Sequence, residues 1–560
     1  MSGQPEENIK SQIFNAPRLM IASPASGSGK TTLTCGILQL LKNHGKSPVS
    51  FKCGPDFIDP MFHRQVLGIH STNLDSFFVD EEELRQIFIE NMESENDCLP
   101  GEEAGEGIQV ENNQPEKIAV IEGVMGLFDG LGGKSLKASS YDIARITKTP
   151  ILLCIPACGM SRSIVPLVKG FLDYDKAHSG TGENLIKGIF LNKVTKSTFQ
   201  LLKSMIEEEL SAEYGVKVIG YLPKDSDLNW ESRHLGLFLP DEIKNLKEQI
   251  QKTAKTLEAT LDFEAVEKIS KIKSDRDFKG LCPLGERVHF SALTSVSSQK
   301  VAEFCNQNSL VITPHPCGDG SVNCGMMGET SPDKLSSFTF QFSVSIAVAL
   351  DEAFCFYYQD NLRLLEKAGA KLVYFSPLHD KSLPSGIQGL LLGGGYPELY
   401  ASRLQANESM RATIRQAVEN GLPVMAECGG FMYLQEKLIT ERGESYEMCG
   451  AIKGQCRYTG KLVRFGYAEF TLKGGSDKNT GVKKSGLPVN FSVKGHEFHY
   501  FDSSNNGSDF TASKPLSDRS WDCMISTPTM LAGFPHLYYR SNPEIVSWFL
   551  GVCKSERRNF

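Results

Sequence analysis

Short runs of mainly apolar residues alternate with segments of helical spacing in two separate parts of the chain. In the first part the runs are residues 19–22, 118–121, 151–155 and 189–191, and in the second part they are residues 344–349, 371–375, 389–392 and 423–426. A strand that lacks polar alternation is buried on both faces, as in a parallel sheet that helices cover. The pattern therefore predicts an α/β fold with two parallel sheets in succession.

The length of 560 residues agrees with this division, because a single hydrophobic core stops growing near about 250 to 300 residues. Two polar segments interrupt the pattern: an acidic stretch at residues 92–117, which predicts a disordered surface insertion, and residues 268–335, whose periodicity is weak. Residues 244–259 predict a polar helix. The predicted parts are a flexible N-terminus (1–17), a first domain (18–262) that carries the acidic insertion, a linker or insertion region (263–340) and a second domain (341–560).

Charge and cysteine content restrict the possible partners and compartment. The formal net charge of −8 provides no overall basic field that would hold nucleic acid or an anionic membrane surface. The 15 cysteines form no short-spaced framework, and no run approaches the roughly 20 apolar residues of a membrane span. The first residues are polar and acidic, unlike a secretory signal. We therefore expect a cytoplasmic protein without nucleic-acid or membrane partners.

A phosphate-binding loop is predicted where the first apolar run meets a helical segment. The sequence there is Ser23-Pro-Ala-Ser-Gly-Ser-Gly-Lys-Thr-Thr32. Backbone N–H groups of Gly27, Ser28 and Gly29 can curl around phosphate oxygens, aided by the helix N-terminus. Lys30 adds a positive charge, Thr31 can ligate Mg²⁺, and Thr32 adds a second hydroxyl. Pro24 replaces the usual first glycine, and the alternative is a glycine-rich turn before an ordinary helix.

Acidic residues at two other positions are candidates for the same site. Glu122 follows the second apolar run, at the sheet edge where α/β proteins bind ligands, so it can hold Mg²⁺ directly or through water. The alternative is an acidic residue that caps a helix. Phe51-Lys-Cys-Gly-Pro-Asp-Phe-Ile-Asp-Pro60 is predicted as a turn-rich loop in which Lys52, Asp56 and Asp59 bind metal or orient substrate. A solvated loop is the alternative there.

A cysteine nucleophile is predicted in the second part, where Ala426-Glu-Cys-Gly-Gly430 joins a strand to an apolar helix. A sharp strand-to-helix turn with small neighbours places Cys428 at a helix N-terminus, which is expected to lower the pKa of the thiol. Gly429 and the glycine loop that contains Gly394 and Gly395 can present amide donors to an oxyanion. The alternative is a buried structural cysteine.

A thiol that attacks a carboxamide also needs a base, and spacing leaves three candidates: His496, His499 and His536. His536 can equally be a core or surface histidine. The segment Gly495-His-Glu-Phe-His-Tyr500 resembles a metal-ligand set, but the sequence offers no third ligand at a suitable spacing. The residues alone do not choose among the three histidines.

The motifs and their order resemble the cobyrinic acid a,c-diamide synthase family. The resemblance rests on the phosphate loop, Gly-Pro-Asp-Phe-Ile-Asp-Pro60, Asn73-Leu-Asp75, Glu122-Gly-Val-Met-Gly-Leu-Phe-Asp-Gly130, Arg233-His-Leu-Gly-Leu237 and most of residues 344–543. It implies a P-loop domain similar to dethiobiotin synthetase, followed by a flavodoxin-like CobB/CobQ-type class I glutamine amidotransferase domain. The implied ligands are L-glutamine, ATP, Mg²⁺ and a corrinoid polycarboxylate, whose a and c carboxylates are phosphorylated and amidated.

The resemblance also implies residue roles. Cys428 would be the glutaminase nucleophile and His536 its base, in a dyad without the glutamate of other class I enzymes. Glu122, Asp56, Asp59 and Asp129 match acidic positions near metal, phosphate or substrate. The sequence departs from the family at both insertions and at Tyr538, where a second histidine is common. Other acceptors, such as nickel sirohydrochlorin or an unrelated polycarboxylate, therefore stay open, as does a non-catalytic regulatory protein.

Overall fold

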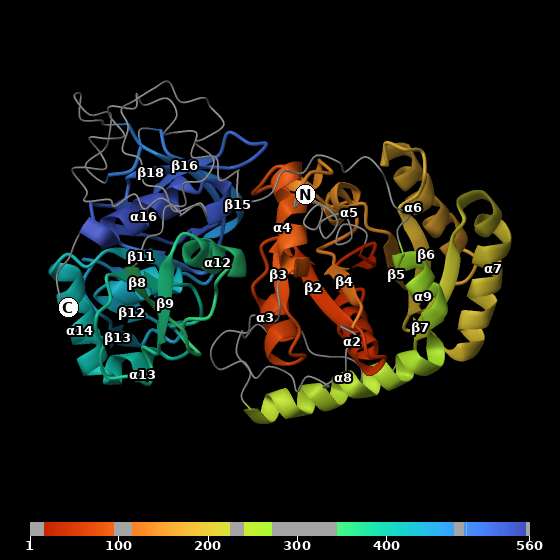
Figure 1. Ribbon diagram of the computed structural model, residues 1–560, viewed down its shortest axis with the longest axis horizontal. Helices are drawn as coiled ribbons and strands as arrows, with labels where there is room; N and C mark the ends of the chain where they lie inside the picture. Colours follow the sequence, from red (N-terminus) through yellow and green to blue (C-terminus); the bar gives the residue numbers. More distant parts are fainter. Residues whose placement is uncertain are drawn as a thin grey trace, which may run out of the picture.

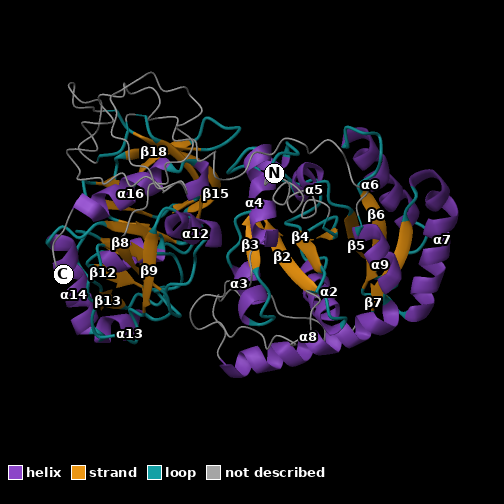
Figure 2. Cartoon of the chain, in the orientation of Figure 1, coloured by secondary structure: helices purple, strands orange, loops and turns teal. Residues whose placement is uncertain are grey.

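The chain folds into two α/β halves that lie side by side, with the N-terminal half on the right of Figure 1 and the C-terminal half on the left. The computed structural model describes residues 16–93, 115–224, 240–271, 344–474, 486–488 and 490–555, without the side chains of residues 240–244. Figure 2 shows that helices flank the sheets of both halves, as the alternating pattern predicts. The predicted fold class is confirmed.

The N-terminal half contains a seven-stranded sheet in the order β3-β2-β4-β1-β5-β6-β7, and every neighbouring pair is parallel. Its strands are β1 (Arg18–Ala22), β2 (Ser47–Cys53), β3 (Ser71–Leu74), β4 (Lys117–Glu122), β5 (Ile151–Pro156), β6 (Ile186–Asn192) and β7 (Lys217–Leu222). Because the strands are parallel, the carboxyl ends of β1, β2 and β4 meet at one edge of the sheet. That edge carries the candidate nucleotide site.

Helices cover both faces of this sheet. One face packs against α2 (Lys30–Asn43), α3 (Ile58–Gln65), α8 (Pro240–Thr260) and α9 (Phe263–Ser270), and the other against α4 (Glu81–Glu93), α5 (Ser140–Thr147), α6 (Ile164–His178) and α7 (Lys196–Tyr214). A short 3-10 turn, η1, spans Leu131–Gly133. Helix α8 runs along α2 (Figure 1), and α9 contributes Val266 to the same core, so packed elements of this half extend past residue 262.

The structure corrects two details of the sequence prediction here. Residues 51–60 do not form one loop: Lys52 lies inside strand β2, and Asp59 lies in the first turn of helix α3. The predicted acidic insertion is shorter at its ends, because Met92 belongs to α4 and Lys117 begins β4. Strand β2 escaped prediction because Ser47, Ser50 and Lys52 interrupt its apolar pattern.

The C-terminal half is built around a six-stranded sheet in the order β20-β21-β11-β10-β8-β9, parallel except for β20. Its strands are β8 (Val344–Ala349), β9 (Ala370–Phe375), β10 (Gly389–Leu392), β11 (Val424–Glu427), β20 (Ile525–Ser526) and β21 (Met530–Gly533). One face packs against α13 (Ala401–Ala406), α14 (Glu408–Glu419) and α15 (Gly429–Leu434), and the other against α12 (Gln359–Lys367) and α16 (Glu544–Ser555).

Two smaller sheets complete this half. The four-stranded sheet contains β12 (Lys437–Ile439), β13 (Ser445–Glu447), β14 (Gln455–Tyr458) and β17 (Phe501–Ser503). The five-stranded sheet contains β15 (Arg464–Leu472), β16 (Ser492–His499), β18 (Phe510–Ser513), β19 (Ser520–Cys523) and β22 (His536–Leu537), and the 3-10 turn η5 (Tyr539–Ser541) follows it. Strand β22 pairs with β16 through His536 and His496, which brings two candidate histidines together.

Polar contacts join the two halves. Arg540 donates to Glu83 over 2.7 Å and to both Glu90 oxygens over 2.8 and 3.0 Å. Tyr467 of β15 donates to Asp75 over 2.7 Å, so the five-stranded sheet reaches the N-terminal half. Such contacts between residues hundreds of positions apart hold the two halves in a fixed position relative to each other.

Some predicted segments lie outside the described residues, namely residues 233–237 and most of the acidic insertion and of residues 268–335. Within the described ranges, no helix combines the length and apolar character needed to cross a bilayer.

Candidate functional site

The predicted phosphate loop joins β1 to α2. Gly27 and Gly29 both have positive φ, 73° and 90°, and Gly29 precedes the first residue of α2. A Cβ on Gly29 would lie 2.2 Å from the Asn192 side-chain nitrogen, which itself donates to the Ser28 carbonyl over 2.9 Å. Only glycine suits this position, since it tolerates both the left-handed backbone and the close approach. The loop therefore has the predicted strand-loop-helix setting.

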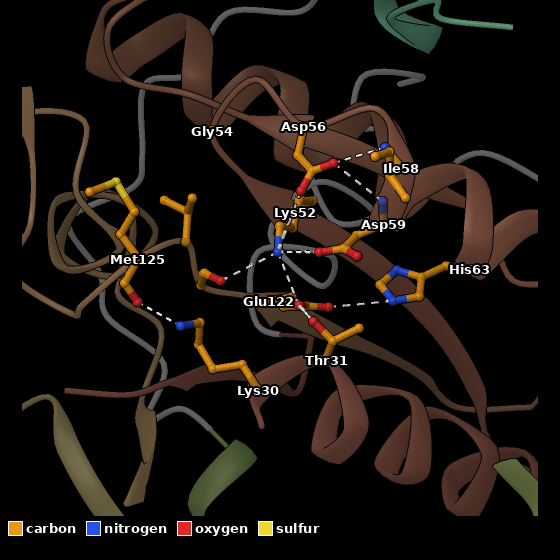
Figure 3. A network of polar contacts seen from close by, with 12 residues as sticks. Lys30, Thr31, Lys52, Gly54, Asp56, Ile58, Asp59, His63, Glu122 and Met125 are labelled. Atoms are coloured by element: carbon orange, nitrogen blue, oxygen red, sulfur yellow. Dashed lines mark hydrogen bonds and ion pairs between the residues drawn. The ribbon is translucent and has the colours of Figure 1, made fainter. Parts of the chain in front are cut away.

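Lys30 and Thr31 reach from the first turn of α2 toward the carboxyl end of β4. The Lys30 ammonium donates to Ser23 Oγ over 2.9 Å. It also donates to the Met125 carbonyl over 2.6 Å (Figure 3). Thr31 Oγ1 donates to Glu122 Oε1 over 2.6 Å. Thr32, next in the helix, is half-buried. The structure thus brings the loop together with Glu122, as the sequence predicts.

Lys52 forms the centre of a buried charge cluster (Figure 3). Its Nζ lies 2.9 Å from Glu122 Oε1, 2.5 Å from Asp59 Oδ2 and 4.0 Å from Asp56 Oδ2. Lys52 and Glu122 are 4% and 0% exposed, so water screens this cluster little. One ammonium therefore faces three carboxylates at the edge where a nucleotide would bind.

The surroundings of these groups shift their pKa values in opposite directions. Burial raises the pKa of Glu122, but Lys52, His63 and Thr31 outweigh that effect and hold the pKa below its usual range. Burial and the neighbouring Glu122 charge raise the pKa of Asp59 well above its usual value, against the effect of Lys52. Burial, followed by repulsion from Lys52, lowers the pKa of Lys30. The raised pKa of Asp59 reflects the cost of gathering carboxylates here, a cost that an additional cation would lower.

His63 belongs to this cluster, although the sequence did not single it out. Its Nε2 lies 3.5 Å from Glu122 Oε2, and its Nδ1 lies 2.8 Å from Ser50 Oγ. It is fully buried on helix α3. No local motif marks this histidine, because its partners come from β2 and β4.

The residues at this site suit Mg²⁺. Glu122 Oε2 is buried without a hydrogen-bond partner, and the Thr31 hydroxyl lies on the other carboxylate oxygen. Mg²⁺ is usually held by one or two protein oxygens together with phosphate oxygens and waters. Within the described part of the chain, no set of three His, Cys, Asp or Glu side chains is placed to hold a metal ion.

The two remaining acidic candidates have structural contacts of their own. Asp56 Oδ1 accepts hydrogen bonds from the N–H groups of Ile58 and Asp59 and thereby satisfies two backbone donors at the start of helix α3. Its other oxygen faces Lys52. Asp129 Oδ2 accepts from the Gly126 N–H over 2.9 Å and so fixes the loop after β4 beside the Pro24 carbonyl. Asp56 lies in the charge cluster, whereas Asp129 lies against the phosphate loop.

Cys428 occupies a strained turn between β11 and α15. Its φ of 48° and ψ of −103° are rare for a side chain other than glycine and are typical of a nucleophile elbow. The turn needs Gly430, because a Cβ there would lie 2.3 Å from the Leu392 carbonyl oxygen. Burial, followed by the Glu398 charge, raises the pKa of the Cys428 thiol and outweighs the lowering by the Gly429 N–H at the start of α15.

The predicted oxyanion loop contacts both sides of this site. The Gly395 amide nitrogen lies 3.1 Å from where a Cβ on Gly429 would stand, beside the elbow. A Cβ on Gly394 would lie 2.3 Å from His536 Cε1, so the imidazole ring rests on the loop. Gly429, Gly394 and Gly395 thus lie together between Cys428 and His536.

The three histidines have different surroundings. His496 Nδ1 is 2.9 Å from the Tyr358 hydroxyl, and His499 Nδ1 is 2.6 Å from the Phe501 carbonyl oxygen. His536 Nδ1 is buried with no hydrogen-bond partner. Burial, together with repulsion from His496 and His499, lowers the pKa of His536 well below its usual value. A neutral imidazole can accept a proton, and the His536 ring lies against Gly394 of the oxyanion loop.

Phe57 joins the two sites, although the sequence does not single it out. It lies between Asp56 and Asp59 in sequence, and its ring centroid is 5.0 Å from that of His536 and 5.5 Å from that of His496. It also stacks on Phe356 and packs at a tilt against Tyr358 of the C-terminal half. The segment that carries the acidic cluster therefore touches the histidine of the cysteine site.

Comparison with known proteins assigns both halves. Residues 19–238 match the CobQ/CobB/MinD/ParA nucleotide binding domain, and residues 345–542 match the CobB/CobQ-like glutamine amidotransferase domain. Cobyrinate a,c-diamide synthase of Caldanaerobacter subterraneus subsp. tengcongensis is 34% identical over 96% of this chain and 98% of its own length. The proteins of the same name from Listeria innocua and Priestia megaterium are 33% and 31% identical, over 96% and 97% of this chain and 99% and 98% of theirs. The chain belongs to the cobyrinate a,c-diamide synthase family of glutamine-dependent amide-forming ligases.

Proposed function

We propose that the chain uses ATP to activate the a and c side-chain carboxylates of cobyrinic acid, or of hydrogenobyrinic acid, and amidates them with nitrogen from glutamine in cobalamin biosynthesis. One observation carries the proposal: a phosphate loop with a carboxylate cluster and a cysteine elbow with a histidine lie in one chain, and Phe57, which directly follows Asp56 of the cluster, packs against that histidine. Each site supplies what the other lacks, because one activates an acid and the other releases ammonia.

In the cysteine site, Cys428 Sγ would attack the carboxamide carbon of glutamine. His536 would take the thiol proton and return it to the departing nitrogen, which leaves as ammonia. The N–H groups of Gly395 and Gly429 are the donors proposed for the oxyanion, with Gly394 supporting the loop. Water would then cleave the thioester and release glutamate. The low pKa of His536 favours the neutral base that this cycle needs at its start.

In the nucleotide site, an oxygen of the acceptor carboxylate would attack the γ-phosphorus of ATP, and ADP would leave. Ammonia would then attack the acyl phosphate and displace inorganic phosphate. The loop N–H groups from Gly27 to Thr32 and the Lys30 ammonium would hold the phosphates. Mg²⁺, held by Thr31 and Glu122, would neutralise phosphate charge. Lys52, Asp56 and Asp59 would orient the acceptor, with Asp129 holding the neighbouring loop.

The test incubates the purified chain with cobyrinic acid, ATP and glutamine that carries heavy nitrogen in its amide. Mass spectrometry should find the heavy nitrogen in the corrinoid product. Cys428→Ala should abolish glutamine-driven amidation and retain ammonium-driven amidation. Lys30→Met should abolish both, because it removes a charge at the phosphates while leaving the cysteine site intact.

Two results would redirect the proposal. Amidation of another acid, such as nickel sirohydrochlorin or an unrelated polycarboxylate, without turnover of cobyrinic acid would favour that acceptor. No glutamine hydrolysis with any acceptor would favour a nucleotide-binding regulatory protein. The two outcomes are distinguishable, because glutaminase activity survives in the first and is lost in the second.

A further inference from the structure

The Nδ1 atom of His536 has no hydrogen-bond partner, and the carboxylate of Glu427 lies opposite it. Nδ1 is buried and unpartnered, and Glu427 Oε2 lies 4.0 Å away. The side chains of His536 and Glu427 are 4% and 12% exposed. A histidine that acts as a base needs its proton on the nitrogen that does not face the nucleophile, which requires an acceptor at that nitrogen.

Glu427 is well held for such a role. It ends strand β11, directly before Cys428, and pairs in register with Gly533 of β21. Its Oε1 accepts from the Tyr539 hydroxyl over 3.1 Å. Burial raises the pKa of Glu427 to about 8, and the contacts with Tyr539 and the Leu537 N–H lower this pKa without outweighing burial. These two contacts come from the residues that follow His536. Oε2 is the carboxylate oxygen that lies 4.0 Å from His536 Nδ1.

The position two residues after His536 does not serve the imidazole. Tyr538 stands there, and its hydroxyl donates to Asp360 over 3.0 Å. Its ring stacks on Phe78 of the N-terminal half, with centroids 4.8 Å apart. Tyr538 is therefore committed to the contact between the halves, and Glu427 faces the imidazole instead.

We infer that Glu427 is the positioning residue for His536, so that the chain has a Cys-His-Glu arrangement whose carboxylate comes from the residue before the nucleophile. This inference rests on the proposed glutaminase activity. The Glu427 carboxylate would accept the Nδ1–H of His536 and fix the tautomer that leaves Nε2 free. It would also stabilise the imidazolium formed when the thiol proton moves. The 4.0 Å separation is longer than a hydrogen bond and would shorten in the substrate complex.

The test measures glutamine hydrolysis by Glu427→Gln in the full chain. We expect kcat to fall by about 100-fold, the loss that a misplaced catalytic group typically causes. KM for glutamine should stay within about twofold, since Glu427 acts through His536 and does not bind the substrate. Glu427→Asp keeps the charge and should recover part of kcat. Amidation driven by ammonium chloride should be unchanged in both variants, which reports that the chain is folded.

Glu258→Gln is the matched control, because Glu258 also faces a histidine, His44, over 3.0 Å, but on the exposed surface of the other half. It should leave both activities unchanged. The inference is overturned if Glu427→Gln keeps kcat within twofold, or if Glu427→Asp is as impaired as Glu427→Gln while ammonium-driven amidation is intact. Failure of the unaltered chain to hydrolyse glutamine would instead overturn the proposed function.

Discussion

At the scale of single residues, the local sequence predicts the phosphate loop and the cysteine turn. It does not predict the side chains that contact these sites from distant parts of the chain. Gly29 and Cys428 were identified because turn chemistry depends on adjacent residues, and the structure gives both the expected backbone. His63, Phe57 and Glu427 were missed, since each acts on groups far away in sequence. Side chains that meet through the fold leave no local signal.

Replacing Gly394 with alanine should disable the cysteine site. A Cβ there would lie 2.3 Å from His536 Cε1, so the imidazole must move. We expect glutamine hydrolysis to fall by about 100-fold, as for a catalytic group displaced by about 1 Å, while ammonium-driven amidation persists. Gly551→Ala is the control, since it adds a Cβ in open space on α16. Equal glutaminase rates in the two variants would contradict this prediction.

Replacing Lys52 with methionine should both destabilise the fold and stop amidation. The change leaves Glu122 and Asp59 buried without their cation. Removing one partner of a buried ion pair costs about 3–5 kcal/mol. Denaturant unfolding of the variant measures the loss. Lys46→Met is the control: Lys46 pairs with Glu116 and Glu267 nearer the surface, where a pair contributes about 0–1 kcal/mol. A smaller loss for Lys52→Met than for Lys46→Met would exclude the proposed cluster.

At the scale of elements, the apolar strands were predictable and the polar ones were not. The predicted strands at residues 151–155 and 344–349 correspond to β5 and β8, because each is apolar on both faces. Strand β3, with the sequence Ser-Thr-Asn-Leu, carries little apolar signal and is buried by its neighbours alone. The contact of α4 with Arg540 joins residues 450 positions apart, so no local pattern announces it.

The Arg540 contact should contribute most of the polar stability between the halves. Arg540→Met leaves Glu83 and Glu90 without their guanidinium, and Glu90 is 9% exposed. We expect a loss of about 3–5 kcal/mol, against about 0–1 kcal/mol for Lys367→Met, whose half-exposed ammonium also pairs with Glu90. Thermal unfolding compares the variants. Equal melting temperatures for the two would refute the assignment.

The same contact predicts an acid dependence. Burial raises the pKa of Glu90, but Arg540 and Lys367 outweigh it and lower the pKa from the usual 4.5 to about 2. A carboxylate with a depressed pKa stabilises the fold fully above its unfolded value, and this stabilisation is lost as pH falls from 4.5 toward 2. Arg540→Met should weaken the decline in stability over that interval. Denaturant unfolding at stepped pH measures it, and an unchanged slope would contradict the expectation.

At the scale of the whole molecule, the two parallel sheets were predictable, but their mutual placement was not. The apolar pattern of the strands predicts each sheet separately. The position of one sheet relative to the other depends on contacts such as that of Tyr467 with Asp75. Phe57 packs against His536 and directly follows Asp56 of the acidic cluster in sequence. The proposed function would have neutral ammonia pass from Cys428 through the protein to the acidic cluster.

Scavenging free ammonia should leave glutamine-driven amidation nearly unchanged. Ammonia that passes within the protein does not mix with the solvent, where most of it would be protonated at neutral pH. The measurement follows amide formation with and without a glutamate dehydrogenase scavenging system. Ammonium-driven amidation is the control and should stop under the same treatment. If scavenging also stops the glutamine-driven reaction, the internal path does not exist.

The contact of Phe57 with His536 also has a pharmacological meaning. Asp56, Phe57 and Asp59 occupy one short segment, so a small molecule that displaced this segment would disturb acid activation and ammonia release together. A resistance mutation within this segment would then have to preserve both reactions. An inhibitor aimed at this segment should consequently meet resistance less readily than one aimed at the phosphate loop alone.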